Sequence, residues 1–179
     1  VSAGSWEKWR SDAGRFPASV LGKSNGWPGE RWLDIRKVSV LAPIMRARVR
    51  MCARKRFDAV EFDNVDGYAN RTGFDLTGAD QLTFDRWLAD AAHSRGLGVG
   101  LKNDLDQVPQ LASSFDFSID EQCAQYKECD ALSPFVAAGK PVFVGLAPGV
   151  VESTDAWANF ITDLTDRGLA CPLLVVSDG

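Results

Sequence analysis

The sequence predicts an α/β protein with a (β/α)8 barrel of the TIM type that lacks its first βα units. Strand-like and helix-like segments alternate along the 179 residues, and polar residues follow three successive strands where each one ends. Alternation implies βαβ units and a parallel sheet. A barrel gathers all its strand ends at one mouth, whereas an open doubly wound sheet gathers only those at its switch point. The polar strand ends therefore favour the barrel.

The elements follow one another from residue 44 onward. Apolar Ile44, Ala47 and Met51 recur at helical spacing. Gly96 and Gly139 follow two later helices, as glycine often does where a helix ends. We expect helices at 44–57, 83–96, 108–115, 129–139 and 153–168, and strands at 58–64, 97–104, 116–122, 140–147 and 171–179.

The remaining features concern size and composition. Residues 1–36 are expected to form loops, with room for a short strand before Ser5. Because a full barrel needs about 250 residues, we expect one partial barrel domain over residues 1–179. A net charge of −4 and a pI near 5.0 argue against a nucleic-acid partner. The basic run at 46–57 is interpreted as a solvated helix face.

No apolar run approaches the roughly 20 residues of a membrane span, and no signal peptide is visible. We therefore expect neither a nucleic acid nor a membrane as partner, and a monomer if the barrel is complete. Cys123 and Cys129 are six residues apart and belong to no C-x-x-C pair. They form either a local disulfide, if the protein is secreted, or two unrelated buried thiols.

Strand parity places the acids of the first long strand at the barrel mouth. Glu61 and Asp63 share one face of the strand, and Val60 and Phe62 share the other. In a barrel the apolar face meets the helices, so the acidic face points inward. On the next strand Lys102 and Asp104 share a face with the small residues before them. Lys102 is either a snorkelling lysine or an orienting partner for a carboxylate.

The third strand leaves an ambiguity, because its end carries two acids. Glu121 follows Phe117 and Ile119 in parity, whereas Asp120 follows Ser118, and the sequence does not decide which acid faces the pocket. The lone histidine, His93, lies near a helix C-terminus. A Ser-His-Asp triad or a multi-histidine zinc site is therefore hard to build, and carboxylates must carry any chemistry.

Paired carboxylates on different strand ends are what glycoside hydrolysis requires, with one protonated and one ionised. We expect no cofactor and no resident metal. One alternative is a divalent-metal enzyme with Asp63, Asp66 and Asp104 as oxygen ligands. Another is a non-catalytic barrel fragment that binds polysaccharide. Asp66 stands before Gly67, where a turn role is an equal alternative to a site role.

Five motifs in order, VSAGSWEKWR, GWPGERWLDIR, FDAVEFDNVDGY, GLGVGLKND and FDFSIDEQCAQYKEC, resemble glycoside hydrolase family 114, the endo-α-1,4-polygalactosaminidases. The resemblance runs from residue 1 to about 143. It implies a secreted (β/α)8 barrel that cleaves α-1,4-linked, galactosamine-containing polysaccharide by a retaining two-carboxylate mechanism. It also implies a Cys123–Cys129 disulfide.

Carried over position by position, the resemblance implies that Asp63 is the nucleophile and Glu121 the acid/base. We also expect a set of substrate-binding residues, namely Glu61, Asn64, Asp66, Tyr68, Lys102, Asn103, Asp104, Asp120, Gln122 and Trp6. The acids suit a cationic polymer, which they would attract into the cleft. Trp6, Trp9 and Trp27 either stack on sugar rings or anchor loops.

The chain departs from the family pattern at three places. Phe62 replaces the proline that usually precedes the aspartate, on the outer face of the strand. Asp120 replaces an asparagine beside Glu121, so two acids lie side by side. VGLAP, residues 144–148, replaces a segment that usually carries a histidine and a glutamate.

Overall fold

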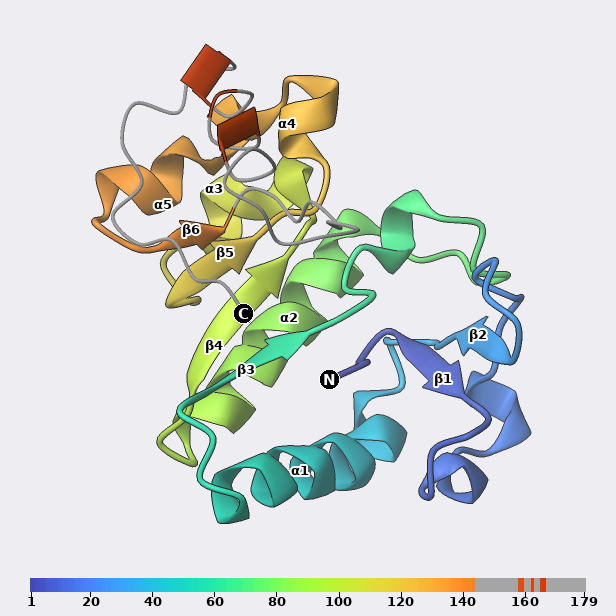
Figure 1. Cartoon of the computed structure of the whole chain (residues 1–179). Helices are drawn as coiled ribbons and strands as arrows, with labels where there is room; N and C mark the ends of the chain where they lie inside the picture. Colours follow the sequence, from blue (N-terminus) through green and yellow to red (C-terminus); the bar gives the residue numbers. More distant parts are fainter. Residues whose placement is uncertain (144–157, 160–161, 163–164, 167–179) are drawn as a thin grey trace.

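The computed structural model describes residues 1–143 together with residues 158, 159, 162, 165 and 166 (Figure 1). Its strands are β1 (Ser5–Glu7), β2 (Glu30–Trp32), β3 (Ala59–Phe62), β4 (Gly98–Lys102), β5 (Phe117–Ile119) and β6 (Val142–Phe143). Its α-helices are α1 (Val38–Arg54), α2 (Gly78–His93), α3 (Val108–Leu111), α4 (Cys123–Tyr126) and α5 (Ser133–Ala137). Single 3₁₀ turns are η1 (Ala13–Arg15), η2 (Ala18–Val20), η3 (Gly67–Ala69), η4 (Leu105–Gln107) and η5 (Cys129–Leu132).

The main sheet is parallel and follows chain order, β3-β4-β5-β6. On the free side of β3 the chain start pairs in parallel, because Ser2 bridges Asp63 and the Asp63 N–H donates to Val1 O at 2.9 Å. Within the described residues the sheet does not close into a barrel. The predicted α/β class with a parallel sheet is confirmed, as is the short strand-like pairing before Ser5.

Alternation decides which face of the sheet is buried. Val60 and Phe62 of β3 and Val99 and Leu101 of β4 are buried and belong to one hydrophobic core with α2. Figure 1 shows α2 running against β3 and β4, with which it makes close contacts. The opposite face carries the polar side chains, as parity predicted. Phe62, where the family pattern has proline, packs in the core.

Two helices begin earlier than predicted. α1 starts at Val38 and contains Pro43, because Leu41 and Ala42 before Ile44 already belong to the buried face. α2 starts at Gly78, where Thr77 accepts from the Asp80 N–H and the Asp80 carboxylate accepts from the Thr77 N–H. This is a capping box with aspartate in place of the usual glutamate or glutamine.

The later elements are shorter than predicted. The helix expected at 108–115 is α3, preceded by η4, and that expected at 129–139 is η5 followed by α5, which Gly139 ends at a φ of 66°. Within the helix expected at 153–168, the described residues are helical. The strand expected at 171–179, and the second half of that at 140–147, lie outside the described residues.

The N-terminal region is more ordered than predicted. β1 and β2 pair in antiparallel fashion, with Ser5 opposite Trp32 and Glu7 opposite Glu30. α1 is tied to this region by Arg48, whose guanidinium donates to both Asp12 carboxylate oxygens and to Ser2 O. Arg48 is buried, so the basic run at 46–57 is not uniformly a solvated face.

None of the described helices combines the length and the apolar composition that crossing a membrane requires.

Candidate active site

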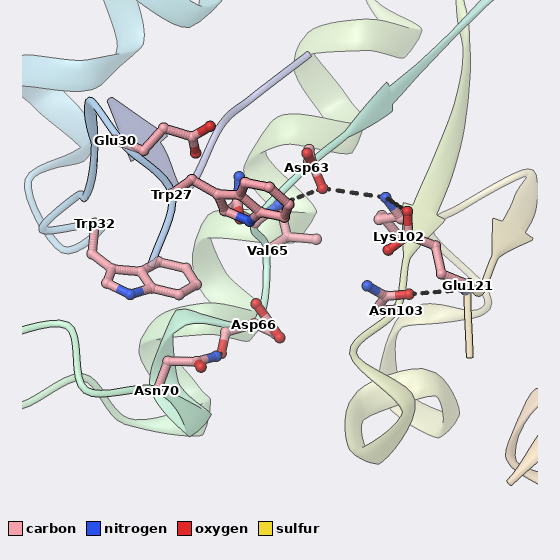
Figure 2. A pocket seen from close by; sticks show the side chains of 11 residues that line it. Trp27, Glu30, Trp32, Asp63, Val65, Asp66, Asn70, Lys102, Asn103 and Glu121 are labelled. Carbon is pink, nitrogen blue, oxygen red and sulfur yellow. Dashed lines mark hydrogen bonds and ion pairs between the residues drawn. The ribbon is translucent and has the colours of Figure 1, made fainter. Parts of the chain in front are cut away.

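A pocket of about 330 Å³ lies at the carboxyl ends of β3 and β4, and Glu30 and Trp32 of β2 are among its other lining residues. Figure 2 shows its walls, with Glu30 and the tryptophans on one side and Lys102 and Glu121 on the other. The lining residues are Trp27, Glu30, Trp32, Asp63, Asn64, Val65, Asp66, Asn70, Lys102, Asn103 and Glu121.

Lys102 joins three carboxylates at the edge of this pocket. Its Nζ lies 3.2 Å from Glu121 Oε1, 3.4 Å from Asp63 Oδ1 and 3.6 Å from Glu61 Oε1. Burial lowers the pKa of Lys102, but the charges of Asp63, Glu61 and Glu121 together raise it above its usual value. Lys102 is therefore a fixed cation among the three acids, which makes it an orienting partner and not a snorkelling surface lysine.

Asp63 and Glu121 converge although they come from nonadjacent strands. Because both contact the same nitrogen, Asp63 Oδ1 and Glu121 Oε1 are no farther apart than the sum of 3.4 Å and 3.2 Å. Inverting glycosidases have roughly 6.5–9.5 Å between their two carboxyl groups, and this upper limit lies at the short end of that range. Retaining glycosidases have about 5–5.5 Å, which lies within the limit. The spacing suits a cooperating carboxylate pair.

Left-handed asparagines turn the chain at the ends of β3 and β4. Asn64 and Asn103 have φ values of 62° and 52°, a region that asparagine tolerates better than most residues. The Asn64 N–H donates to Asp63 Oδ1 at 3.1 Å, and Asn103 Oδ1 accepts the Glu121 N–H at 3.3 Å. The two turns thus hold the two acids.

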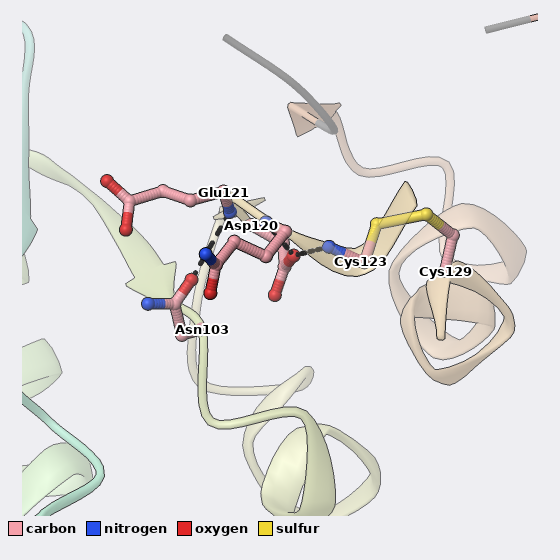
Figure 3. The surroundings of a disulfide bond; sticks show 6 residues. Asn103, Asp120, Glu121, Cys123 and Cys129 are labelled. Atoms are coloured by element: carbon pink, nitrogen blue, oxygen red, sulfur yellow. Dashed lines mark hydrogen bonds between the residues drawn. A yellow bond between two sulfur atoms is a disulfide. The ribbon is translucent and has the colours of Figure 1, made fainter. Parts of the chain in front are cut away.

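Of the two acids after β5, Glu121 lines the pocket, and Figure 3 shows its side chain extending away from the Asp120 carboxylate. Asp120 is buried, and its Oδ1 accepts the N–H groups of Gln122 and Cys123. Asp120 and Gln122 do not line the pocket, and their expected role in substrate binding stays a prediction. The Cys123–Cys129 disulfide follows this turn in the chain and confirms the predicted pairing.

Asp66 lines the pocket, but Asp104 and Tyr68 do not. Burial raises the pKa of Asp66, so its neutral form is favoured more than usual. Asp104 turns away from Lys102 because its own backbone is left-handed, with a φ of 48°, and its side chain is buried. Parity with Lys102 was therefore a wrong guide at this position.

Asp104 lies instead near the half-buried Tyr68 and the buried Asp85, whose Oδ1 accepts from Gln81 Nε2 at 2.8 Å. Burial raises the pKa of Asp104 to about 7, raises that of Asp85 well above its usual value and raises that of Tyr68. The Tyr68 hydroxyl lies near Asp104, yet neither Asp104 oxygen has a partner in hydrogen-bond geometry among the described residues. These acids are held in a setting that disfavours their charged forms.

Trp6 does not line the pocket either, and its expected role in substrate binding stays a prediction. Its indole Nε1 donates to Ala13 O at 3.1 Å, and its ring packs against the core outside the pocket. The pocket's aromatic wall is made by Trp27 and Trp32. No sequence pattern singles out Trp32 or Glu30, because both belong to a three-residue strand that is too short to show a period.

The alternative metal site is not assembled. Asp104, one of its three expected ligands, is buried away from the pocket that Asp63 and Asp66 line. In the part of the chain that the structure describes, no three His, Cys, Asp or Glu residues are placed to hold a metal ion together.

A parallel sheet whose carboxyl-end pocket presents two converging carboxylates defines a protein of the barrel glycosidase class. The chain belongs to glycoside-hydrolase family GH114, whose family model matches residues 1–145. The resemblance noted in the sequence is thus confirmed at the level of the family.

One solved structure that the chain resembles is Ega3 of Aspergillus fumigatus in complex with galactosamine, with 43% identity and a TM-score of 0.80. The similarity covers 89% of this chain and 66% of the Ega3 chain. The glycoside hydrolase domain of PelA from Pseudomonas aeruginosa is 15% identical over 94% of this chain and 73% of its own, with a TM-score of 0.64, and supports the fold alone. A comparison with curated proteins gives no match.

Proposed function

We propose that this protein is a glycoside hydrolase that cleaves α-1,4-linked, galactosamine-containing polysaccharide with retention of configuration. The observation that carries the proposal is the contact of Asp63 and Glu121 with one Lys102 nitrogen, which brings two carboxylates from separate strand ends within reach of one glycosidic bond. Family membership and the similarity to a protein solved with galactosamine support it.

The chemistry divides between the two acids. Asp63 attacks the anomeric carbon while Glu121 gives its proton to the leaving glycosidic oxygen, so the C–O bond breaks and a glycosyl ester forms on Asp63. Glu121 then takes a proton from water, whose oxygen attacks the same carbon and releases Asp63. The Asn64 N–H at 3.1 Å and Lys102 Nζ at 3.4 Å orient the Asp63 carboxylate for this attack.

Glu121 has to carry a proton in the first step, although Lys102 lies beside it. Its side chain is 51% exposed and lines the pocket, so a leaving glycosidic oxygen can approach it. The half-exposed position of Glu121 is thus consistent with the role of acid. The contact between Asp63 and Asn64 is consistent with the role of nucleophile for Asp63.

The electrostatics of the pocket favour a cationic substrate. Its lining residues include four acids, Glu30, Asp63, Asp66 and Glu121, against one cation, Lys102. Deacetylated galactosamine units carry ammonium groups, which such a pocket attracts. Trp27 and Trp32 supply the aromatic surface on which sugar rings stack.

Turnover of a deacetylated galactosamine polymer tests the proposal. Asp63→Asn and Glu121→Gln should each lower kcat by about 10³-fold or more, since each removes a covalent or proton-transfer role. Exposed acids outside the pocket give matched controls, Asp90→Asn and Glu128→Gln, which should keep wild-type rates. Equal rates in all five proteins reject the assigned pair, and wild-type binding without turnover makes the chain a polysaccharide-binding barrel instead.

Secretion is part of the same proposal. The Cys123–Cys129 disulfide supports it, because disulfides persist mainly in oxidising compartments. Accumulation of the native, disulfide-bonded protein in the culture medium would support secretion, and retention of a reduced protein inside the cell would contradict it.

A further inference from the structure

We propose that Glu30 determines specificity for the amino sugar by binding its ammonium group on the pocket wall opposite Lys102. The inference rests on the proposed function and names a residue that the catalytic pair does not include. Glu30 reaches the pocket from β2, beside Trp27, whereas Lys102 and Glu121 form the other wall (Figure 2).

Glu30 is held by one of its two oxygens. Its Oε2 accepts from Asn25 Nδ2 at 2.6 Å and from Ser5 Oγ at 3.3 Å. Among the residues that the structure describes, no hydrogen bond engages Oε1 and no Lys, Arg or His forms an ion pair with this carboxylate. The carboxylate is therefore oriented but lacks a cation.

The hydrogen bonds that hold Glu30 continue to the catalytic strand. Ser5 Oγ accepts from Asn64 Nδ2 at 3.0 Å, and Asn64 follows Asp63 directly. Asn25, the other partner of Glu30, also accepts the Trp27 N–H on its Oδ1 at 3.1 Å. One chain of contacts thus fixes Glu30 relative to both the proposed nucleophile and the aromatic wall.

Comparison of the four pocket acids shows why Glu30 is the one available to an ammonium group. Asp63 and Glu121 are already paired with Lys102. Burial raises the pKa of Asp66, which disfavours its charged form. Glu30 alone combines an oriented carboxylate with the absence of a partner cation, so a sugar ammonium beside Trp27 would supply the missing charge.

The chemistry also predicts discrimination against acetylated units. An N-acetyl group has no positive charge and brings a carbonyl oxygen, which a carboxylate repels. Loss of the Glu30 charge should therefore weaken the binding of amino sugars and leave N-acetylated sugars almost unaffected.

The test compares wild type, Glu30→Gln and Glu30→Asp on fully deacetylated and on partly N-acetylated polymer. Glu30→Gln should lower kcat/KM on the deacetylated polymer at least 10-fold, mainly by raising KM. It should change kcat/KM for cleavage at N-acetylated units of the partly acetylated polymer less than 2-fold. Glu30→Asp keeps the charge and should retain more of the preference. Glu128→Gln, an exposed charge neutralisation outside the pocket, should change neither, and circular dichroism should show native folding for each variant.

A binding measurement separates this inference from the proposed function. Calorimetry with galactosamine and N-acetylgalactosamine on Asp63→Asn, with and without Glu30→Gln, reports recognition without turnover. If the wild type cleaves the polymer but Glu30→Gln keeps the full preference for deacetylated units in both assays, the inference is wrong and the proposed function stands. If the wild type cleaves neither polymer but Glu30→Gln abolishes the preference for galactosamine in calorimetry, the proposed function fails and the Glu30 assignment survives.

Discussion

Lys102 Nζ lies 3.4 Å from Asp63 Oδ1, and the side chain of Lys102 is 11% exposed while that of Asp63 is 46% exposed. The cation is therefore the more deeply placed partner and the acid is open to the pocket. The positive charge of Lys102 thus lies beneath the more exposed carboxylate of Asp63. Lys102 also contacts Glu61 and Glu121, so its removal leaves three acids facing one another.

Lys102→Met should lower kcat by about 10²-fold, the effect typical of one lost electrostatic contact to a reacting group. Lys102→Arg keeps the charge and should recover part of the activity.

The control for these variants is Lys55→Met, which removes an exposed lysine after α1. It should keep the kcat of the wild type. If Lys102→Arg folds like the wild type but recovers no activity, the charge of Lys102 is not what the reaction needs, and Lys102 only supports the local structure.

The sequence predicts β3, β4 and β5 well because each combines an apolar face with polar residues at its end. Val60 and Phe62 alternate with Glu61. In a parallel sheet with helices on one face, this pattern is satisfied only if Val60 and Phe62 face the helices and Glu61 faces the other side. The core, the pocket edge and the pair Asp63 and Glu121 follow from that alternation together with the family resemblance.

Parity stops being informative where a strand ends in a left-handed residue. Asp104 and Lys102 have the same parity, but Asn103 and Asp104 both have positive φ and turn Asp104 into the interior. The β1–β2 side of the pocket could not be predicted either. Glu30 and Trp32 belong to β2, whose partner β1 is distant in sequence and pairs with Ser5 opposite Trp32. Neither strand is long enough to show alternation.

Asp104→Asn should reduce the pH dependence of stability. Burial raises the folded pKa of Asp104 to about 7 from an ordinary 3.8, so between these pH values the folded state holds a proton that the unfolded state has lost. This contribution to stability is present below about pH 4 and is lost as the pH rises to about 7. The asparagine mimics the protonated form and should stabilise the protein at pH 8, by on the order of 2–4 kcal/mol, with little change at pH 4.

Urea unfolding at several pH values between 4 and 9 measures this effect, and asparagine suits the left-handed φ of the site. Asp90→Asn, at an exposed position of α2, should leave the pH dependence unchanged. A constant difference between Asp104→Asn and wild type at every pH would show that the carboxyl is ionised in the folded protein throughout the range.

Reduction of the Cys123–Cys129 disulfide should destabilise the end of β5 and lower activity. The bridge closes a six-residue separation, for which the chain-entropy model gives about 2–3 kcal/mol. Asp120 caps the N–H of Cys123, so loosening this turn also releases Glu121 beside it. The double variant Cys123→Ser, Cys129→Ser should show a lower Tm that reductant does not lower further.

Cys52→Ala is the control for the reductant, since Cys52 forms no disulfide in the described part of the chain. Its Tm should still fall when reductant is added. An unchanged Tm of the wild type in reductant would contradict the stabilising role of the bridge.

Gly4→Ala should impair both stability and activity, because a Cβ at this position would lie 1.6 Å from the carbonyl oxygen of Asn64. That atom belongs to the backbone and cannot rotate away, so the chain start or the end of β3 has to move. Both Ala3 and Gly4 donate their N–H groups to Asp63 O, so the displacement reaches the proposed nucleophile directly. We expect a loss of about 1–3 kcal/mol in unfolding free energy and a fall in kcat larger than the loss of folded protein explains.

Gly14→Ala is the matched control, since nothing lies within 4 Å of a Cβ there and its φ is not positive. The same substitution should leave the unfolding free energy and kcat near their wild-type values. If Gly4→Ala has wild-type kcat per folded molecule, the pairing of the chain start with β3 serves stability alone, and the position of Asp63 is set by β3 and Asn64 without it.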